Sequence, residues 1–497
     1  MHDTFGPGLR LPIPASEVGT TLIESLYRHA DQRPEAEAVS ELGGISCTYR
    51  ELAELITDRS RTMTETLKPE SVIVAALPSG VEYVAWFCAA IASGMRFLPM
   101  HAQIAGPEAL AVSARARAVA AVVEPGLVAG TLHGLKNLYR TGGNPQRQRP
   151  YSERVVSTPL AAMPGGVVLG SSGTTGLPKL AVREGQSLDA DAAGVIAGLG
   201  LTSDDRVLAA TPLSHSYGVD LLVATLTVGA ALRIVTRFDA DAVARELDAG
   251  ITVLPGVPFI FEALARCEGR RGGSLRLAIS AGSTLPERVR RAFTAAWSVD
   301  VGQLYGATEL GTVAMDSPHM ENFDPASVGK PLPGVSARVI DVGDDQRELA
   351  VGEQGQLVVR APSMLSRYLD GDVPLVDGHW LTGDLARIGI DGRITITGRL
   401  KLLIDVGAYK VNPLEVESVL STHPGIFECV VVPVAASETV QRLRAVVASR
   451  AGEPQPTADG VRQFLRERLS PIKVPRIIEF VDSLPKSPTG KVLRDQV

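Results

Sequence analysis

Apolar runs that alternate with helical stretches limit most strongly how this chain can fold. Residues 72–77 form an apolar run rich in β-branched side chains, and a Pro-Ser-Gly break, a helical stretch at 81–92 and a second apolar run at 97–100 follow. The same order recurs at residues 207–211, 219–227 and 231–235. Strands that alternate with helices favour a mostly parallel sheet with helices on its faces. The sequence therefore predicts an α/β fold.

The residues Thr48 and Glu51 mark the start of one helix. A threonine followed three positions later by a glutamate forms a capping box, and Leu52, Leu55 and Ile56 then recur at helical spacing. We therefore expect a helix that begins directly after Thr48.

The pattern changes near residue 385. Residues 386–390 and 393–397 alternate apolar and polar side chains around an Asp-Gly turn, which predicts a β-hairpin. Beyond it the sequence predicts, in order, a helix near 413, strands near 429–433 and 443–449, a helix at 461–469 and a strand near 476–480. We interpret residues 1–398 as a large N-terminal domain and residues 399–497 as a small α+β domain.

Composition limits the classes of function. The chain has an ordinary globular balance of 45% hydrophobic and 21% charged residues, and its net charge of −6 gives no electrostatic reason to bind nucleic acid or an anionic membrane. The first residues lack the basic and apolar segments of a signal peptide, and no stretch reaches the ~18 apolar residues of a membrane helix. The cysteines form no C-x-x-C pair. We expect a soluble, cytoplasmic protein whose cysteines are buried.

The segment Gly170-Ser-Ser-Gly-Thr-Thr-Gly-Leu-Pro-Lys179 is the strongest local signal. Glycines let a backbone curl its N–H groups around phosphate oxygens, hydroxyls add neutral donors, and a lysine adds positive charge. The segment differs from the G-x-x-x-x-G-K-[ST] loop, because Lys179 stands three residues after the last glycine and no Ser or Thr follows it. Taken alone, it is either a phosphate-binding loop or a surface loop.

Four further motifs follow this loop in order: YGATE at 305–309, WLTGD at 380–384, GRLK at 398–401 and PTGK at 488–491. Together with the loop, they resemble the adenylate-forming superfamily of acyl-CoA synthetases, peptide-synthetase adenylation domains and beetle luciferases. The resemblance implies a large N-terminal domain of α/β subdomains with a small β-rich subdomain. A small, mobile α+β C-terminal domain would follow.

The resemblance also implies an ATP site. Tyr305 would stack on adenine beside the loop 282–284, Asp384 would accept hydrogen bonds from both ribose hydroxyls, and Arg399 would touch the ribose or a phosphate. The alternative, less favoured, is that Tyr305 is an ordinary core aromatic and Asp384 a residue that stabilises a turn. The full set implied for the nucleotide is Ser171, Ser172, Gly173, Thr174, Thr175, Gly176, Lys179, Gly282, Ser283, Thr284, Tyr305, Gly306, Asp384 and Arg399.

Four residues are implied for catalysis. Thr308 would bind the α-phosphate, and Glu309 would hold Mg²⁺, which prefers oxygen ligands. Lys491 would enter the active site and bridge the attacking carboxylate and the α-phosphate, because a cation between two anions stabilises their encounter. His215 lies in the loop that the family places beside the acyl carboxylate. The reaction implied is formation of an acyl-AMP from a carboxylic acid and ATP, followed by acyl transfer to a thiol.

Lys401 matches the family position at which the C-terminal domain swings between two arrangements. One arrangement would serve acyl-AMP formation and the other thiol transfer, so one active site would serve both half-reactions. Residues 407–410 would then face the pantetheine arm.

The choice of acid depends on residues near His215, where Ser216, Tyr217 and Ala307 would line the acyl pocket. Peptide-synthetase domains place an aspartate where this chain has Ser216, so an ordinary α-amino acid is not expected. Asp220 lies at the expected start of a helix near residue 219, and it has two interpretations. It is either an acidic residue favoured by the helix dipole or the partner of a substrate amine one carbon further from the carboxylate.

The second interpretation resembles stand-alone enzymes that load β-amino acids onto acyl carrier proteins for macrolactam polyketides. The acceptor would then be a separate carrier protein. CoA is the alternative acceptor, with an aryl or aliphatic acid as substrate. A non-catalytic or luciferase-like nucleotide-binding protein is the alternative from another class. The presence of Lys491, Glu309 and Asp384 argues against a non-catalytic protein, and no specialised luciferin pocket is recognisable in the sequence.

Overall fold

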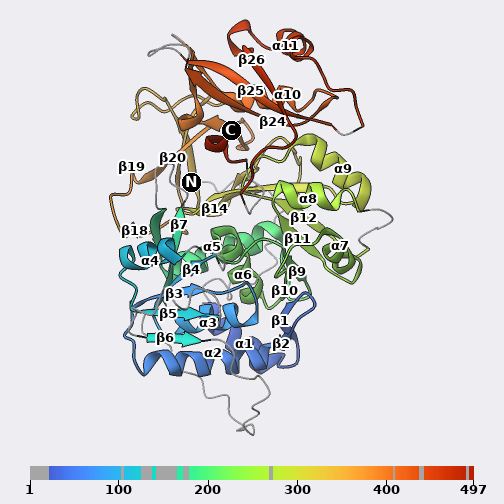
Figure 1. Ribbon diagram of the computed structural model, residues 1–497. Coiled ribbons are helices and arrows are strands. Elements are labelled where there is room, and N and C mark those ends of the chain that lie inside the picture. Colours follow the sequence, from blue (N-terminus) through green and yellow to red (C-terminus); the bar gives the residue numbers. More distant parts are fainter. Residues whose placement is uncertain are drawn as a thin grey trace, which may run out of the picture.

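The computed structural model describes residues 22–101, 104, 106–124, 137–140, 165–171, 178–267, 273–406, 409–435, 441–450, 452–487 and 492–497. It confirms the α/β fold with mostly parallel sheets, a large N-terminal domain and a small C-terminal domain, which lies at one end of the molecule (Figure 1). Among these residues, the helices are too short or too polar to cross a membrane. The four cysteines form no disulfide; Cys47 and Cys88 are buried, and the other two are half-buried.

The first sheet of the N-terminal domain has the strand order β15-β14-β13-β12-β11-β9-β10-β1-β2. The strands from β13 to β1 in this order run parallel, and antiparallel strands close both edges. The bounds are β1 Glu37–Glu41, β2 Ser46–Thr48, β9 Arg206–Ala209, β10 Ala231–Ile234, β11 Val253–Gly256, β12 Leu277–Ser280, β13 Val301–Ala307, β14 Gly311–Asp316 and β15 Lys330–Pro331.

The second sheet has the order β18-β8-β7-β4-β3-β5-β6 and is parallel from β7 to β6. Its bounds are β3 Val72–Ala76, β4 Arg96–Met100, β5 Ala120–Val123, β6 Asn137–Arg140, β7 Gly166–Ser171, β8 Lys179–Arg183 and β18 Arg367–Tyr368. Both predicted strand–helix–strand units are present as parallel pairs, β3 with β4 and β9 with β10.

Helices fill the space between the two sheets and cover their outer faces. The inner helices are α1 (Leu22–Gln32), α2 (Tyr49–Thr64), α3 (Val81–Ala92), α5 (Gly185–Leu199) and α6 (Ser216–Val228), which share one large apolar core. Helices α7 (Ala240–Asp248), α8 (Pro258–Leu264) and α9 (Glu287–Trp297) cover the outer face of the first sheet, and α4 (Gly106–Arg115) covers the second (Figure 1).

The predicted capping box is confirmed at the start of α2. Thr48 Oγ1 accepts a hydrogen bond from the Glu51 backbone N–H at 3.3 Å, and the Glu51 carboxylate accepts one from the Thr48 N–H at 2.8 Å. The start of α6 was predicted wrongly, because the helix begins at Ser216 instead of residue 219. Its additional first turn contains Ser216, Tyr217 and Gly218, whose polar and small side chains hid the helical pattern.

A smaller antiparallel sheet completes the N-terminal domain. Its strands follow the order β16-β17-β20-β19, and β21 pairs with β20 as the predicted hairpin. The bounds are β16 Ser336–Ile340, β17 Gly355–Arg360, β19 Leu375–Val376, β20 His379–Ile388 and β21 Ile394–Arg399.

The C-terminal domain contains the hairpin β22 (Ile404–Val406) and β23 (Tyr409–Val411), followed by the sheet β24-β25-β26. Helices α10 (Pro413–Leu420) and α11 (Ala458–Arg466) pack on this sheet around a separate apolar core. The sheet strands are β24 Ile426–Ala435, β25 Gln441–Ser449 and β26 Ile477–Val481.

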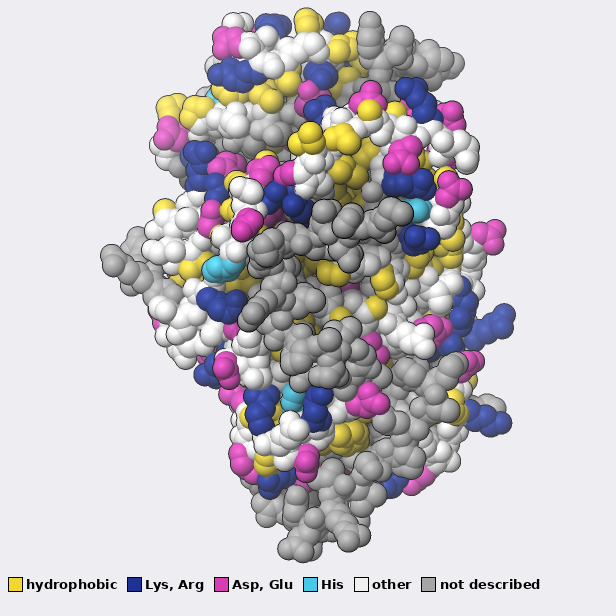
Figure 2. Space-filling view, turned by 180° about the vertical axis from the view of Figure 1, so that it is seen from behind, with side chains coloured by type: hydrophobic (Ala, Val, Ile, Leu, Met, Phe, Trp, Pro, Cys, Tyr) yellow, Lys and Arg dark blue, Asp and Glu magenta, His cyan; other side chains and the backbone are white. Residues whose placement is uncertain are grey.

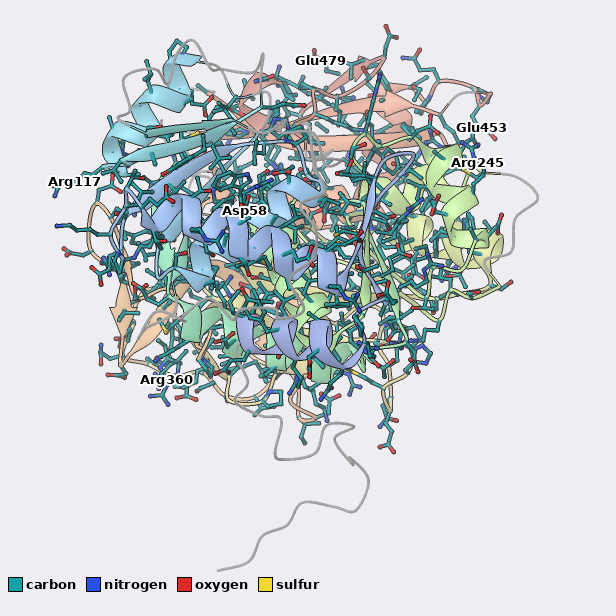
Figure 3. The ribbon with its side chains drawn as sticks, turned by 90° about the horizontal axis from the view of Figure 1, so that it is seen from below. Asp58, Arg117, Arg245, Arg360, Glu453 and Glu479 are labelled. Atoms are coloured by element: carbon teal, nitrogen blue, oxygen red, sulfur yellow. The ribbon has the colours of Figure 1, made fainter. Side chains whose placement is uncertain are left out.

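Charged side chains of both signs share the molecular surface. Figure 2 shows acidic and basic residues mixed over the described part of one face. In the perpendicular view of Figure 3, Arg117, Arg245, Arg360, Glu453 and Glu479 project outward at the rim. This mixed surface agrees with the near-balanced charge of 49 basic and 55 acidic residues.

Candidate active site

Tyr305 and Asp384 lie within hydrogen-bonding distance although 79 residues separate them in the chain. The Tyr305 hydroxyl donates to Asp384 Oδ2 at 2.7 Å, and Arg399 Nε forms an ion pair with Asp384 Oδ1 at 2.6 Å. Asp384 and Arg399 are register partners on β20 and β21. Burial, reinforced by the Asp384 carboxylate, raises the pKa of Tyr305 and keeps its hydroxyl protonated. The structure therefore brings together the residues predicted for adenine and ribose.

The predicted loop 282–284 follows β12, which is the parallel neighbour of β13. Ser280 at the end of β12 is the register partner of Gln303, two residues before Tyr305. The carboxyl ends of parallel strands meet at one edge of a sheet, and ligands of open α/β sheets bind at that edge. Gly282 adopts a φ of 82°, which favours glycine, and Ser283 and Thr284 are exposed.

Thr308 and Glu309 lie in the tight connection between β13 and β14. Across this hairpin Gly306 pairs with Thr312 and Ala307 with Gly311, and a Cβ on Gly306 would lie 2.5 Å from the Gly311 carbonyl oxygen. Only glycine therefore fits at position 306. The close approach fixes the connection, so that Thr308 and Glu309 lie directly beyond Tyr305 at the same edge of the sheet.

The buried Glu309 is held by the segment around β18. Its backbone carbonyl accepts from Leu365 N at 2.7 Å, and its Oε1 accepts from the Tyr368 hydroxyl at 2.9 Å. Burial, reinforced by Glu309, raises the pKa of Tyr368, so the phenol donates at neutral pH. Among the described residues, no group of three or more His, Cys, Asp or Glu could hold a metal. One carboxylate with nucleotide phosphates is a usual Mg²⁺ environment, and Glu309 fits that role.

His215 is the N-cap residue of α6, and it keeps contact with solvent. The protein atoms around the imidazole, together with nearby His101, lower the pKa of His215, so the neutral form prevails at neutral pH. Tyr217, two residues further, donates to the Ile279 carbonyl of β12 at 3.4 Å. This contact ties the start of α6 to the strand that precedes the loop 282–284.

Asp220 has a partner within the protein. Its Oδ1 accepts from Arg183 Nη1 at 2.6 Å, and its Oδ2 accepts from Ser216 Oγ at 3.2 Å. Because Asp220 lies in the second turn of α6, the helix-dipole interpretation is wrong: the first turn contains no acidic residue. The interpretation of Asp220 as an amine-binding residue stays a prediction.

Arg183 joins Asp220 to a second buried carboxyl group. Its Nη2 lies 3.1 Å from Asp191 Oδ2, and Asp191 Oδ1 accepts from Thr312 N at 2.7 Å. The three side chains are at most 6% exposed. Burial, reinforced by the Asp220 carboxylate, raises the pKa of Asp191 well above its ordinary range.

Replacing Asp191 by asparagine is expected to stabilise the protein increasingly as the pH rises. A carboxyl group with a raised pKa contributes stability at low pH and loses it as the pH rises through its folded-state pKa. An asparagine accepts the Thr312 hydrogen bond but cannot ionise, so we expect a gain of about 1 kcal/mol or more at alkaline pH. Thermal unfolding between pH 5 and 9 measures the difference. Asp205→Asn is the control: it breaks the ion pair with Arg276 and should lower the thermal stability of the protein in the same experiment. An Asp191→Asn variant that is less stable at every pH would contradict the raised pKa of Asp191.

Only some of the other predicted positions belong to the described residues. Ser171 ends β7 and Lys179 begins β8, as register partners on adjacent strands. The predicted residues Ser172, Gly173, Thr174, Thr175 and Gly176, as well as Gly407 and Lys491, lie outside the described residues. Ala307 and Gly306 are both in β13, next to Tyr305.

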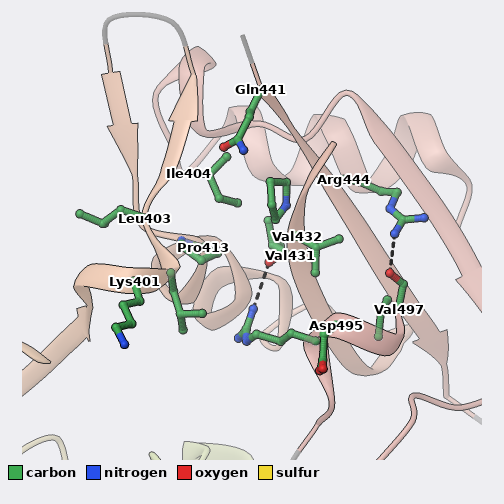
Figure 4. Close-up of a pocket in the computed structure, with 13 residues that line it drawn as sticks. Lys401, Leu403, Ile404, Pro413, Val431, Val432, Gln441, Arg444, Asp495 and Val497 are labelled. Atoms are coloured by element: carbon green, nitrogen blue, oxygen red, sulfur yellow. Dashed lines mark hydrogen bonds between the residues drawn. The ribbon is translucent and has the colours of Figure 1, made fainter. Parts of the chain in front are cut away.

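Lys401 is exposed in a short 3-10 helix (Leu400–Leu402) between the domains. It lies at the edge of a cavity of about 390 Å³ within the C-terminal domain (Figure 4). Arg444 and Arg494 donate across this cavity to the Val497 and Val431 oxygens. The cavity wall contains none of the residues predicted for ATP or acid.

Sequence reasoning missed Arg183, Asp191 and Tyr368. The sequence did give a signal for Arg183, because a charged residue directly follows the apolar residues 180–182. Tyr368 gave no signal, because its role depends on a contact with Glu309, 59 residues away.

Comparison with known proteins identifies a family for both domains. The model of the AMP-binding enzyme family matches residues 26–369, and that of the AMP-binding enzyme C-terminal domain matches residues 415–491. A 3-[(3aS,4S,7aS)-7a-methyl-1,5-dioxo-octahydro-1H-inden-4-yl]propanoyl:CoA ligase of Rhodococcus jostii is 27% identical, covering 97% of this chain and 98% of that protein. Indoleacetate–CoA ligase of Aromatoleum aromaticum is 29% identical, covering 96% and 97%. A long-chain-fatty-acid–CoA ligase of Escherichia coli O157:H7 is 30% identical over 66% of this chain and 60% of that protein.

Solved structures agree with this match. ATP-bound MatB from Rhodopseudomonas palustris superposes with a TM-score of 0.85 at 24% identity, covering 96% of this chain and 99% of that one. The amide bond synthetase McbA from Marinactinospora thermotolerans has a TM-score of 0.83 at 25% identity, covering 96% and 99%.

Proposed function

Because the chain belongs to the AMP-binding enzyme family, we propose that it binds ATP between Tyr305, Asp384 and Glu309 to activate its carboxylic acid. The family is ATP- and Mg²⁺-dependent, and the relatives that align along nearly their full length are named as CoA ligases. The observation that carries the assignment is the Tyr305–Asp384–Arg399 contact at the carboxyl edge of β13, beside Glu309. A carboxylate has about four lone-pair sites, so Asp384 can accept from a ribose diol while it keeps its protein partners.

The reaction has two steps. The acid carboxylate attacks the α-phosphorus of ATP, pyrophosphate leaves, and an acyl-AMP forms; a thiol then attacks the acyl carbon and AMP leaves. Glu309 would hold Mg²⁺, which neutralises charge on the phosphates. Asp384 and Tyr305 fix the nucleoside, and Lys491 stabilises the approach of the two anions. The protein contributes orientation and charge, without a covalent enzyme intermediate.

CoA is the acceptor that we favour. Two relatives that align along nearly their full length are named as CoA ligases, and Asp220 already has Arg183 as its partner. An acid without an amine, either aryl or aliphatic, is the matching substrate. We also propose that the boundary between the N-terminal and C-terminal domains lies between residues 398 and 399. We propose a cytoplasmic location for the enzyme.

A β-amino acid passed to a separate acyl carrier protein is the second candidate, and one observation favours it. The buried cluster contains two carboxyl groups, Asp191 and Asp220, for the single guanidinium of Arg183. A substrate ammonium next to Asp220 would neutralise the extra carboxylate when Asp191 ionises. The negative charge of this cluster would then favour a substrate acid that carries an ammonium group.

Asp220→Ala distinguishes the two candidates. If Asp220 binds the substrate amine, the loss of a buried pair of about 3–5 kcal/mol should lower kcat/KM for a β-amino acid by at least about a hundredfold. The deaminated analogue should be little affected or improve. If Asp220 serves only Arg183, both substrates should change alike, and the thermal stability should fall. Parallel kinetics on the two acids measure the difference, with Asp239→Ala, a helix N-cap on α7, as the control.

The overall function is tested by acid-dependent exchange of pyrophosphate into ATP over a panel of α-amino, β-amino, aryl and fatty acids. The acids that support exchange are then offered with CoA or with a phosphopantetheinylated carrier protein. Exchange with no acid of any class would refute the proposal. A non-catalytic or luciferase-like protein would give no thioester with either acceptor.

A further inference from the structure

Tyr368 contacts both the lysine of the phosphate loop and the proposed metal carboxylate. Its hydroxyl donates to Glu309 Oε1 at 2.9 Å, and its ring centroid lies 5.0 Å from Lys179 Nζ. Tyr368 is 6% exposed, whereas Lys179 is exposed to solvent. A cation within about 6 Å of an aromatic face is attracted by the ring. One side chain therefore joins two charged groups of opposite sign, Lys179 and Glu309.

The backbone around Tyr368 is fixed to the same elements. Tyr368 on β18 is the register partner of Ala181 on β8, the strand that begins at Lys179. Leu365, three residues earlier, donates its N–H to the Glu309 carbonyl at 2.7 Å. Leu365, Tyr368 and Ala181 form one small buried apolar cluster. Glu309 is thus held by its backbone and its side chain to a segment that cannot move independently of Lys179.

We propose that Tyr368 is a positioning residue for the metal–nucleotide complex, with the hydroxyl orienting the Glu309 carboxylate and the ring spacing Lys179 from it. The inference rests on the proposed function, in which Glu309 holds Mg²⁺. One hydrogen bond to Oε1 leaves the other lone pairs of the carboxylate in a fixed orientation for the cation. Partners that orient a metal ligand typically contribute tenfold or more to metal affinity.

Tyr368→Phe keeps the ring and removes only the hydroxyl. We expect it to weaken binding of Mg²⁺–α,β-methylene-ATP about tenfold by calorimetry, and to leave binding of the metal-free nucleotide in EDTA within twofold. The Mg²⁺ concentration at half-maximal pyrophosphate exchange should rise by the same factor. Tyr368→Leu also removes the ring under Lys179, so it should additionally weaken binding of the metal-free nucleotide.

Tyr49→Phe is the matched control. Tyr49 is also buried, donates its hydroxyl to the Ala230 carbonyl at 2.8 Å, and carries Arg33 above its ring, but it lies in α2, away from the site. A purely structural role predicts similar losses of thermal stability in both variants and unchanged Mg²⁺ dependence. The proposal is overturned if Tyr368→Phe leaves the affinity for Mg²⁺–nucleotide within twofold of the wild type. It is also overturned if the variant weakens binding of the Mg²⁺-bound and the metal-free nucleotide equally.

Glu309→Gln separates this inference from the proposed function. If Glu309→Gln weakens Mg²⁺–nucleotide binding and Tyr368→Phe does not, Glu309 holds the metal without the help of Tyr368, and only the inference fails. If neither variant changes the Mg²⁺ dependence, the assignment of Glu309 itself fails, and the inference fails with it.

Discussion

Lys491→Ala is expected to lower acyl-AMP formation by about a hundred- to a thousandfold, because removing one preorganised stabilising group costs that much in comparable sites. Transfer of the acyl group from synthetic acyl-AMP to the thiol should stay within a fewfold of the wild type. Lys491 would act between two anions, the attacking carboxylate and the α-phosphate, and these two meet only in the first half-reaction. Exchange of pyrophosphate and single-turnover thioester formation measure the two steps separately.

The residues on both sides of Lys491 are anchored to the C-terminal sheet. Lys486 pairs with Glu428 of β24 at 2.5 Å, and Arg494 pairs with Glu417 of α10 at 2.5 Å. Lys486 and Val492 also form a β-bridge. These contacts tie the described residues before and after position 491 to the C-terminal domain.

Lys473→Ala is the matched control for Lys491→Ala, since Lys473 is in the same domain and pairs with Glu415 at 2.5 Å. Both half-reactions should be retained in this variant. Equal losses of both half-reactions in Lys491→Ala would contradict a role confined to acyl-AMP formation.

Local patterns predicted the elements of the fold well. Helix α3 was predicted with its observed bounds, Val81–Ala92, since the Pro-Ser-Gly break and Gly94 flank a continuous apolar stretch. The capping box at Thr48 depends on residues three apart and was also correct. The strand order could not be predicted, because β13 pairs with β12 and β14 through contacts that local periodicity does not encode.

Residues of the candidate site were predictable only where they belong to a recognisable sequence motif. Tyr305, Glu309 and Asp384 each stand in a family motif, whereas their mutual contacts became visible with the folded chain. Asp220 shows the limit of sequence reasoning. Its partner Arg183 lies 37 residues earlier, at the end of β8, so a carboxylate that seemed available to a substrate is bonded within the protein.

The arrangement of the two domains depends on a few contacts across their interface. Phe427 of β24 lies near Arg266, which follows α8, and Arg288 of α9, with ring-to-guanidinium distances of 5.3 and 5.4 Å. Arg288 also donates to the Phe427 carbonyl at 3.5 Å. Contacts of this kind are worth about 0.5–1 kcal/mol each at exposed sites. A swing of the C-terminal domain can therefore break them at small cost, provided that the connecting residues rotate freely.

Lys401→Pro removes that rotation. Lys401 lies in a 3-10 helix, Leu400–Leu402. Residues of such helices typically have φ near −50° to −70°, and the proline ring fixes φ at about −65°. The variant should therefore keep the observed arrangement and lose access to others. We expect acyl-AMP formation to be largely retained and thiol transfer to fall by about two orders of magnitude.

Lys401→Ala is the control that separates the loss of rotation from the loss of the side chain, because alanine keeps the backbone free. It should support both half-reactions, while Lys401→Pro supports only the first. The conclusion depends on the ratio of the two rates in each variant, since general destabilisation by proline would lower both together. If thiol transfer from synthetic acyl-AMP proceeded at the wild-type rate in Lys401→Pro, residue 401 would not be the hinge, and the rotation would have to occur elsewhere in the connection between β21 and β22.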